Sequence, residues 1–350
     1  SPSPPPPSFS TSPSLSASPA SSTIEVHLRI RPSSNPSTYH AIDDLDPSTL
    51  IFTVPADHRA ATTNANTTNA NATNAKGGYV DNTRTRYAFK FNSILEPSTS
   101  QATVFRNIGV PAIHNALEGY NSTVFAYGQT SSGKTWSITG GPERYEDRGI
   151  IPRAIAMLFE EFAKRREATG ATYNCYISYL ELYNENGYDL LMAKDTTSST
   201  SSFGATGIGS RSGAVAASSA VSKVTMLEDE DGNYQFRNLS IHPATSEEEA
   251  LNLLFLGDTN RAIGETEMNK SSSRSHCIFT VMIECRPAPG SSTGAAEGTL
   301  IRSKLNLVDL SGSERVHKTS STGQTLTEAK YINSSLFFLE MVIVALHERA

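Results

Sequence analysis

An apolar run that ends in a glycine-bounded loop constrains this chain more than any other feature. Residues 121–127, NSTVFAY, are short, β-rich and apolar, which predicts a central strand of a sheet. The loop that follows, GQTSSGKT at 128–135, fits G-x-x-x-x-G-K-[ST]. Its glycines let the backbone curl so that successive N–H groups point at phosphate oxygens, and the start of a following helix adds its positive end. The segment therefore predicts a strand, a phosphate-binding loop and a helix.

The cation and the hydroxyl at the end of this loop have defined tasks in such a site. Lys134 would neutralise the β- and γ-phosphates of a nucleotide, and the Thr135 hydroxyl would ligate Mg²⁺. The other loop residues would surround the phosphates: Gly128, Gln129, Thr130, Ser131, Ser132 and Gly133. The alternative is a Gly/Ser turn with a solvated lysine, which the preceding strand disfavours. The loop alone indicates an NTPase or a nucleotide-binding protein and no particular reaction.

Two further segments supply the partners that a phosphate site needs. SKLNLVDLSGSER, 303–315, places Asp309 at the end of an apolar strand, Gly312 in a turn whose N–H can reach a γ-phosphate, and Glu314 beside it. MNKSSSRSHCIF, 268–279, brings short hydroxyls and Arg274, which can pair with a buried carboxylate. Taken singly, these segments are also consistent with a strand ending in a polar turn and with a serine-rich loop. Together with GQTSSGKT they form a coherent phosphate, metal and sensor set.

Composition argues against several other classes of protein. The net charge is −6, so no nucleic acid partner is expected without a local basic face. No apolar run approaches the roughly 20 residues that a membrane span needs, so no membrane contact is expected. Three cysteines, an odd number without metal-ligand spacing, indicate buried thiols in a reducing compartment.

Low-complexity tracts interrupt an otherwise core-forming chain. Residues 1–22 are rich in Ser and Pro and predict a disordered terminus, because they cannot bury enough apolar surface to offset the entropy of ordering. The tracts near 57–85 and 195–220 predict insertions into one domain that covers 23–350. The chain begins with Ser and ends in an apolar-periodic stretch without a stop signal, so we expect a piece of a longer protein, with a domain incomplete at its C-terminus.

Segments typical of strands and helices alternate along the rest of the chain. Alternating or β-rich apolar runs predict strands at 24–30, 86–91, 121–127, 173–185, 276–284 and 303–310. Helical spacing predicts helices at 101–118, 149–166, 246–261 and 328–346, the third opened by a capping box of Ser246 and Glu249. Pro111 either kinks the first helix or starts a second one. The interleaving predicts an α/β fold with a central mixed, mostly parallel sheet flanked by helices.

These motifs, in this order, resemble the kinesin motor domain. GQTSSGKT, NKSSSRSH and DLSGSE are similar to its P-loop, switch I and switch II, with Ser311 where the family usually has Ala. LRIRP, SYLELYNENGYDLL and LTEAKYINSSLFFLEMVIVAL resemble its first strand, a later strand and the switch II helix. The similarity runs from about residue 24 to 350. EEEALNLLFLGDTNRAIGETEMN and Glu340 resemble the kinesin nine subfamily, which is associated with cilia and flagella. The resemblance implies a kinesin-type P-loop NTPase fold.

The resemblance also implies roles at the base and at the metal. Arg29, Arg31 and Pro32 would flank the adenine. The ring of Trp136 would lie near the base. The groups on the metal side would be Thr135, Ser273 and, through water, Asp309.

Further residues are implied at the γ-phosphate. Arg274 and Glu314 would form the salt bridge that closes the switches, orders the attacking water and relays its proton. Gly312 would sense the γ-phosphate through its amide, while Ser271 and Asn269 would line the same region. The expected catalytic set is Glu314, Arg274, Ser271 and Gly312.

By resemblance, the chain is an ATP-dependent microtubule motor, a microtubule-stimulated ATPase with ATP and Mg²⁺ as cofactors. Its longer form would be a coiled-coil dimer in the cytoplasm, on the cytoskeleton, and the subfamily implies a cilium or flagellar axoneme. Tubulin is acidic, so a basic, salt-sensitive contact is expected. Candidates for it are Lys223, Arg237, Arg315, Lys318 and Lys330. Two alternatives stay open: a kinesin-like scaffold that binds microtubules without productive turnover, and a P-loop enzyme that is not a motor.

Overall fold

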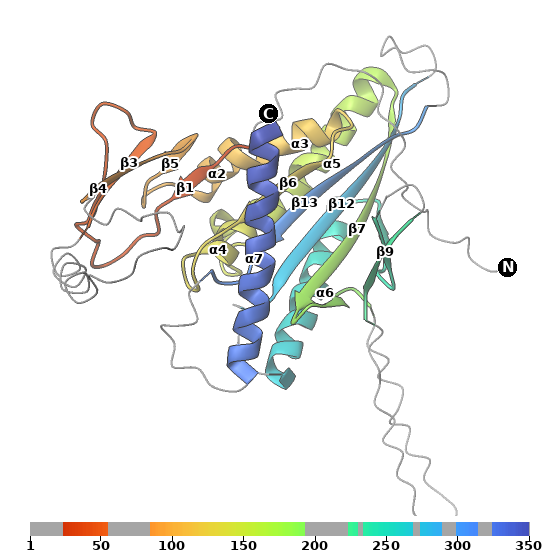
Figure 1. Cartoon of the computed structure of the whole chain (residues 1–350). Helices are drawn as coiled ribbons and strands as arrows, with labels where there is room; N and C mark the ends of the chain where they lie inside the picture. Colours follow the sequence, from red (N-terminus) through yellow and green to blue (C-terminus); the bar gives the residue numbers. More distant parts are fainter. Residues whose placement is uncertain are drawn as a thin grey trace, which may run out of the picture. The chain divides into compact units, whose positions relative to one another are not determined.

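The computed structural model describes residues 24–54, 85–192, 223–229, 234–268, 274–288, 299–313 and 324–349 (Figure 1). The predicted disordered terminus 1–22 and the insertion near 195–220 lie outside these residues, as does the insertion near 57–85 except for Thr85. The described chain divides into two compact units. The first consists of residues 105–341, and the second of residues 24–104 together with 342–349.

A six-stranded sheet forms the centre of the first unit. Its path runs β11-β7-β12-β13-β6, and β8 pairs with β7 beside this path. The strands are β6 (Ser122–Ala126), β7 (Thr172–Tyr183), β8 (Asn186–Asp189), β11 (His242–Ala244), β12 (His276–Arg286) and β13 (Ile301–Asp309). A separate two-stranded hairpin is built from β9 (Thr225–Glu228) and β10 (Tyr234–Arg237). The predicted α/β class with a mixed sheet is confirmed.

The expectation that this sheet is mostly parallel is wrong for the described strands. Only β13 and β6 pair in parallel, whereas β11 with β7, β7 with β12, β12 with β13 and β7 with β8 are antiparallel. Neighbouring antiparallel strands can be joined directly, and β12 is followed by β13 without a described helix between them. The alternation of predicted helices and strands therefore does not imply a helical crossover between every pair of neighbouring strands. The phosphate-loop strand β6 is also the last strand of this described path and not a central one.

Helices α6 (Glu247–Met268) and α7 (Gln324–Arg349) cover opposite faces of the sheet. Tyr179 of β7 lies against α6, because a Cβ built on Gly257 would clash with the Tyr179 ring. Val308 of β13 instead forms a buried cluster with Leu336 of α7. Tyr179 pairs through Phe279 with Leu307, the residue before Val308, so the two contacts lie on alternate sides of the pleat. The side of the sheet toward α6 is called the α6 face, and the other the α7 face.

The ends of the helices follow from local sequence. Pro111 stands in the first turn of α3 (Val110–Leu117), which follows α2 (Gln101–Val104) and a π-helical turn (Phe105–Gly109) without a non-helical residue between them. Pro111 therefore lies where a π-helical turn gives way to an α-helix within one helical run. Helix α5 (Ile150–Thr169) ends at Gly170, whose φ of 73° suits glycine. At the start of α6, Ser246 Oγ accepts the Glu249 N–H at 3.2 Å, as a capping box requires. The Glu249 carboxylate, however, accepts from Thr245 N at 2.7 Å.

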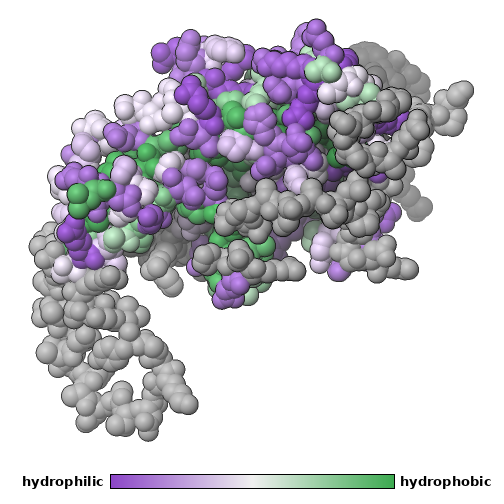
Figure 2. All heavy atoms as spheres, turned by 90° about the horizontal axis from the view of Figure 1, so that it is seen from above, coloured by the Kyte–Doolittle hydropathy of each residue, from purple (hydrophilic) through white to green (hydrophobic). Residues whose placement is uncertain are grey.

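The cysteines behave as the sequence predicts. Cys175, Cys277 and Cys285 are buried and free, and burial raises the pKa of Cys175 to about 12. None of the helices in the described ranges is long and apolar enough to cross a membrane. Much of the face seen from above is hydrophilic, with apolar side chains in limited areas (Figure 2).

The second unit contains two small sheets. Strand β1 (His27–Arg29) pairs in parallel with β5 (Ser93–Leu95). Strand β3 (Thr49–Thr53) pairs on its two sides with β2 (His40–Ile42) and β4 (Arg86–Lys90), both antiparallel. The strands predicted at 24–30 and 86–91 are therefore present, the first of them shorter than predicted.

Candidate nucleotide-binding site

The predicted phosphate loop joins β6 to the short helix α4 (Lys134–Ile138). Gly128 must be glycine, because its φ is 155° and a Cβ there would stand 2.7 Å from Ser132 Oγ. Gly133 precedes α4 with a φ of 99°, and Ser131 has a φ of 62°. These left-handed residues give the loop the curl that a phosphate-binding loop needs.

The Lys134 side chain lies across the loop. Its Nζ donates to Gly128 O at 2.9 Å and to Gln129 O at 3.0 Å. Both acceptors are neutral carbonyls of the loop. A phosphate anion would be a stronger partner for the ammonium group than either carbonyl, so these bonds can be exchanged when one binds.

Thr135 and Asp309, both predicted to lie on the metal side, contact each other directly, while their role toward a metal stays a prediction. Thr135 Oγ1 donates to Asp309 Oδ2 at 2.6 Å. The pairing follows from the sheet, because β6 and β13 run in parallel and Asp309 stands opposite Ala126, shortly before the loop begins. Asp309 is 4% exposed, so its carboxylate is almost fully removed from solvent.

Sequence reasoning missed Arg261, which forms an ion pair with Asp309. Its Nη1 lies 3.6 Å from Asp309 Oδ2, and Arg261 is 7% exposed. A signal was present: Ala250, Leu254 and Gly257 precede Arg261 at helical spacing on the buried face of α6. A charged residue at an apolar-face position of a helix points to a buried partner.

A second buried polar contact lies close by on the α6 face. The Tyr179 hydroxyl donates to Asp258 Oδ1 at 2.9 Å. Burial raises the pKa of Asp258, which the hydrogen bond from Tyr179 and the charge of Arg261 oppose. The α6 face thus concentrates buried charges beside β13.

The oxygen atoms at Asp309 suit a hard divalent cation. Asp309 Oδ1 is buried and has no hydrogen-bond partner within the described part of the chain. Carboxylate and hydroxyl oxygens are ligands that Mg²⁺ prefers, usually with waters and substrate phosphates completing the shell. Among the described residues, no group of three or more His, Cys, Asp or Glu side chains could hold a metal by itself. The site therefore fits a metal shared with a bound phosphate.

The segment after β13, Leu310–Ser313, is tied to the phosphate loop and to β12. Ser313 N–H donates to Gly128 O at 3.1 Å. Ser311 N–H donates to His276 Nδ1 at 3.2 Å. Gly312, the predicted sensor of the γ-phosphate, stands between these two amides.

The sequence assigned no role to His276. In the structure, its imidazole ring makes hydrogen bonds to Ser311 and to Ser335. Burial, together with the charge of Lys134, lowers its pKa to about 4. Its Nε2 lies 2.8 Å from Ser335 Oγ on α7 and 3.3 Å from Ser311 Oγ. His276 therefore joins β12, the Leu310–Ser313 segment and α7.

The residues predicted to contact the adenine lie within the described part of the chain. Trp136 lies on α4, is 43% exposed, and packs on Gly141, where a Cβ would stand 2.7 Å from its ring. Arg29 belongs to the second unit, where its Nη1 donates to Gln101 Oε1 at 2.9 Å. Arg31 and Pro32 follow it and are exposed. Their contacts with a base stay predictions.

Part of the predicted switch chemistry falls outside the described residues. Ser271, Ser273, Asn269 and Glu314 are among the residues that are not described. Arg274 is half-buried and lies two residues before the start of β12. The predicted salt bridge between Arg274 and Glu314 therefore stays a prediction.

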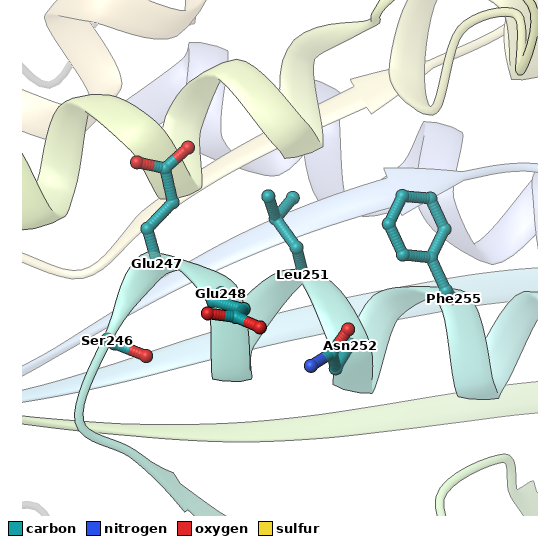
Figure 3. Close-up of a pocket in the computed structure, with 6 residues that line it drawn as sticks. All are labelled: Ser246, Glu247, Glu248, Leu251, Asn252 and Phe255. Carbon is teal, nitrogen blue, oxygen red and sulfur yellow. The ribbon is translucent and has the colours of Figure 1, made fainter.

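A shallow cavity elsewhere does not belong to this site. It has a volume of about 450 Å³ and lies along the first turns of α6. Figure 3 shows Leu251 and Phe255 pointing to the same side of the helix. The lining residues are Ser246, Glu247, Glu248, Leu251, Asn252 and Phe255. None of them comes from the phosphate loop, so the cavity is not the predicted nucleotide-binding site.

Known proteins resemble this chain in sequence and in structure. Residues 52–350 match the model of the kinesin motor domain. The chain is 41% identical over 272 residues to Kinesin-like protein KIF9 of Mus musculus, which covers 78% of this chain and 31% of that protein. It is 40% identical to Kinesin-like protein KLP1 of Chlamydomonas reinhardtii, with the same coverage. The chain thus spans about a third of the length of these curated relatives.

Solved structures of kinesins are also similar to this chain. A KIF14 dimer bound to AMP-PNP in complex with a microtubule has a TM-score of 0.68 at 29% identity, over 93% of this chain and 78% of that one. The structure of a fast kinesin has a TM-score of 0.64 at 27% identity, over 89% and 72% of the two chains. Kinesin motor domains are ATP-binding, microtubule-stimulated ATPases of the cytoskeleton. The chain, with its phosphate loop beside Asp309, belongs to the kinesin motor domain family.

Proposed function

We propose that this chain is an ATP-dependent microtubule motor domain. The observation that carries the proposal is the hydrogen bond of 2.6 Å between Thr135 and Asp309 beside the Lys134 loop, in a chain of the kinesin family. We further propose that residues 23–350 belong to one motor domain, with insertions near 57–85 and 195–220.

Nucleotide binding would use groups that the loop already presents. Lys134 would leave the carbonyls of Gly128 and Gln129 and pair with the β- and γ-phosphates. Backbone N–H groups of the curled loop would donate to the same oxygens. Residues Arg29, Arg31, Pro32 and Trp136 are proposed for the adenine side.

The metal side would be built from Thr135, Ser273 and Asp309, the last acting through water. Bound Mg²⁺ would neutralise charge on the β- and γ-phosphate oxygens. Arg261 is proposed as a positioning residue, because its Nη1 lies 3.6 Å from Asp309 Oδ2 and its positive charge faces that buried carboxylate.

Hydrolysis would depend on positioning and electrostatics more than on covalent catalysis. Gly312 would donate its N–H to the γ-phosphate. Arg274 and Glu314 would close around the attacking water and relay its proton, with Ser271 lining the same region. We expect Glu314→Ala to bind ATP and to hydrolyse it almost not at all. Normal turnover in that variant would contradict the proposed role of Glu314.

The filament would be contacted through exposed basic residues. Lys223, Arg237 and Lys330 are exposed in the structure, and Arg237 lies on the β9–β10 hairpin. The similar KIF14 structure is described in complex with a microtubule. We propose tubulin as the partner, a coiled-coil dimer for the longer protein and, from the likeness to KIF9 and KLP1, a place in the cilium or flagellar axoneme.

The proposal is tested by ATP turnover measured with and without microtubules, on the protein in its longest natural form. We expect slow turnover that microtubules accelerate and that Lys134→Ala abolishes. Bound ATP without any acceleration would instead indicate a microtubule-binding scaffold. A rate of ATP turnover that is the same with and without microtubules would indicate a P-loop enzyme that is not a motor.

A further inference from the structure

The Leu310–Ser313 segment is held on both sides of Gly312 by the protein itself. Ser313 N–H is engaged by Gly128 O at 3.1 Å, and Ser311 N–H by His276 Nδ1 at 3.2 Å. Gly312 is the amide proposed to contact a γ-phosphate. Because the amides are consecutive, a shift of Gly312 toward a phosphate changes the geometry of the bond that Ser311 makes.

His276 extends this bond to α7. Because Nδ1 accepts from Ser311 N–H, the neutral ring carries its proton on Nε2. Nε2 then donates toward Ser335 Oγ at 2.8 Å, and Ser335 Oγ donates to Ile332 O at 2.8 Å. A continuous series of hydrogen bonds thus runs from the backbone at Ser311 to the backbone of α7.

The hydroxyl of Ser311 adds a second bond to the same ring. Ser311 is fully buried, and its Oγ lies 3.3 Å from His276 Nε2. An alanine at this position would keep the backbone bond to Nδ1 and lose only the side-chain bond. The hydroxyl therefore strengthens the attachment of the segment to His276.

We propose that Ser311, His276 and Ser335 form a latch that holds the Leu310–Ser313 segment against α7, and that a γ-phosphate at Gly312 opens it. The inference rests on the proposed nucleotide site and deepens it. Ser311 is a positioning residue in this account, one that weakens binding of a triphosphate relative to a diphosphate. Its bonds are neutral and of 3.2 and 3.3 Å, so they can be exchanged at small cost.

The test compares two nucleotides that differ at the γ-position. Affinities for ADP and for AMP-PNP, each with Mg²⁺, are measured by calorimetry on the wild-type protein, on Ser311→Ala and on Ser335→Ala. We expect each variant to bind AMP-PNP about two- to tenfold more tightly, as the loss of one neutral hydrogen bond allows, with ADP affinity unchanged. The double variant should gain less than the product of the two single gains, because both hydroxyls contact Nε2.

Ser303→Ala is the matched control. Ser303 is 3% exposed on the same strand β13, and its Oγ donates to Ala116 O at 2.6 Å, away from His276. It should lower stability and leave the ratio of the two affinities unchanged. The latch is refuted if Ser311→Ala and Ser335→Ala shift both nucleotides equally or not at all, or if Ser303→Ala shifts the ratio as much. A wild-type protein that binds neither nucleotide would refute the proposed nucleotide site itself.

Discussion

At the end of β13 beside the phosphate loop, the α6 face carries a buried ion pair, whereas the α7 face carries apolar side chains and neutral hydrogen bonds. At the other end of β13, the α7 face does hold a buried charge, because Glu284 is 5% exposed and pairs with Arg302. On the α6 face, Arg261 and Asp309 lie 3.6 Å apart and are 7% and 4% exposed. On the α7 face, Leu336 packs on Val308, and His276 reaches Ser335. Both faces meet at the end of β13, where Asp309 and Ser311 are separated by one residue.

The difference suggests a division of tasks between the faces. Separating a buried ion pair leaves an uncompensated charge, which is far more costly than exchanging one neutral hydrogen bond. The α6 face should therefore keep Asp309 fixed at the metal side. The α7 face can rearrange its hydrogen bonds while its apolar contacts keep the helix in place. The following predictions test this comparison.

The largest expected effect is at Arg261. Arg261→Met would leave Asp309 buried without its cation, and we expect a loss of about 3–5 kcal/mol in the free energy of unfolding. Urea denaturation measures it. The control is Arg144→Met, because the Arg144 side chain is 74% exposed and its ion pair with Asp147 should contribute less than about 1 kcal/mol. Equal, small losses in both variants would show that the α6 face does not depend on buried charge.

The apolar part of the α7 face gives the next largest effect. Leu336 is 8% exposed in its cluster with Val308 and Leu310, so Leu336→Ala should lower the free energy of unfolding by about 2–4 kcal/mol. The neighbouring Phe337 is 56% exposed, and Phe337→Ala should change stability by less than about 0.5 kcal/mol. Similar losses at both positions, measured by the same denaturation, would mean that α7 does not pack as described.

A smaller effect is expected at Thr135. Thr135→Ala removes the donor to Asp309 Oδ2, and an unsatisfied buried acceptor costs about 1–3 kcal/mol. Thr135→Ser keeps the hydroxyl and should retain most of the stability. Removing Mg²⁺ with EDTA should weaken ATP binding strongly in the wild type and little further in Thr135→Ala. If EDTA weakens both equally, Thr135 is not on the metal side.

The smallest effect concerns pH and the α7 face. The pKa of His276 is lowered from 6.5 to about 4 by burial, so the unfolded chain binds a proton that the folded one rejects. Stability from this group is complete above pH 6.5 and is lost as the pH falls toward 4, by about 1–2 kcal/mol between pH 6.5 and 5. Thermal unfolding across this range measures the slope. His276→Asn should flatten it, whereas His114→Asn, an exposed position on α3, should not.

The parts of the site that the sequence predicted lie in contiguous motifs. GQTSSGKT carries its own backbone requirements, and the structure gives Gly128 and Gly133 the positive φ angles that such a loop needs. The position of Asp309 was predicted because it ends an apolar strand in the sequence. Its contact with Thr135 then followed from the parallel pairing of β6 and β13.

The parts that the sequence did not predict depend on contacts between distant segments. Arg261 and His276 acquire their partners only when α6 and α7 cover the sheet, and a sequence window shows neither. The direction of the strands was likewise invisible, because a hairpin and a crossover leave the same hydrophobic pattern in a fully buried strand. The π-helical turn before Pro111 was not predicted either, because no sequence signal distinguishes it from the α-helical turns on its two sides.

The most direct test of the division between the faces is ATP binding to Asp309→Asn in the presence and absence of Mg²⁺. Asparagine keeps the shape and can still accept from Thr135, but it lacks the charge that faces Arg261. The account predicts that the wild type binds ATP much more tightly with Mg²⁺ and that the variant loses most of this gain while still responding to Ser311→Ala. An unchanged dependence on Mg²⁺ in Asp309→Asn would contradict it.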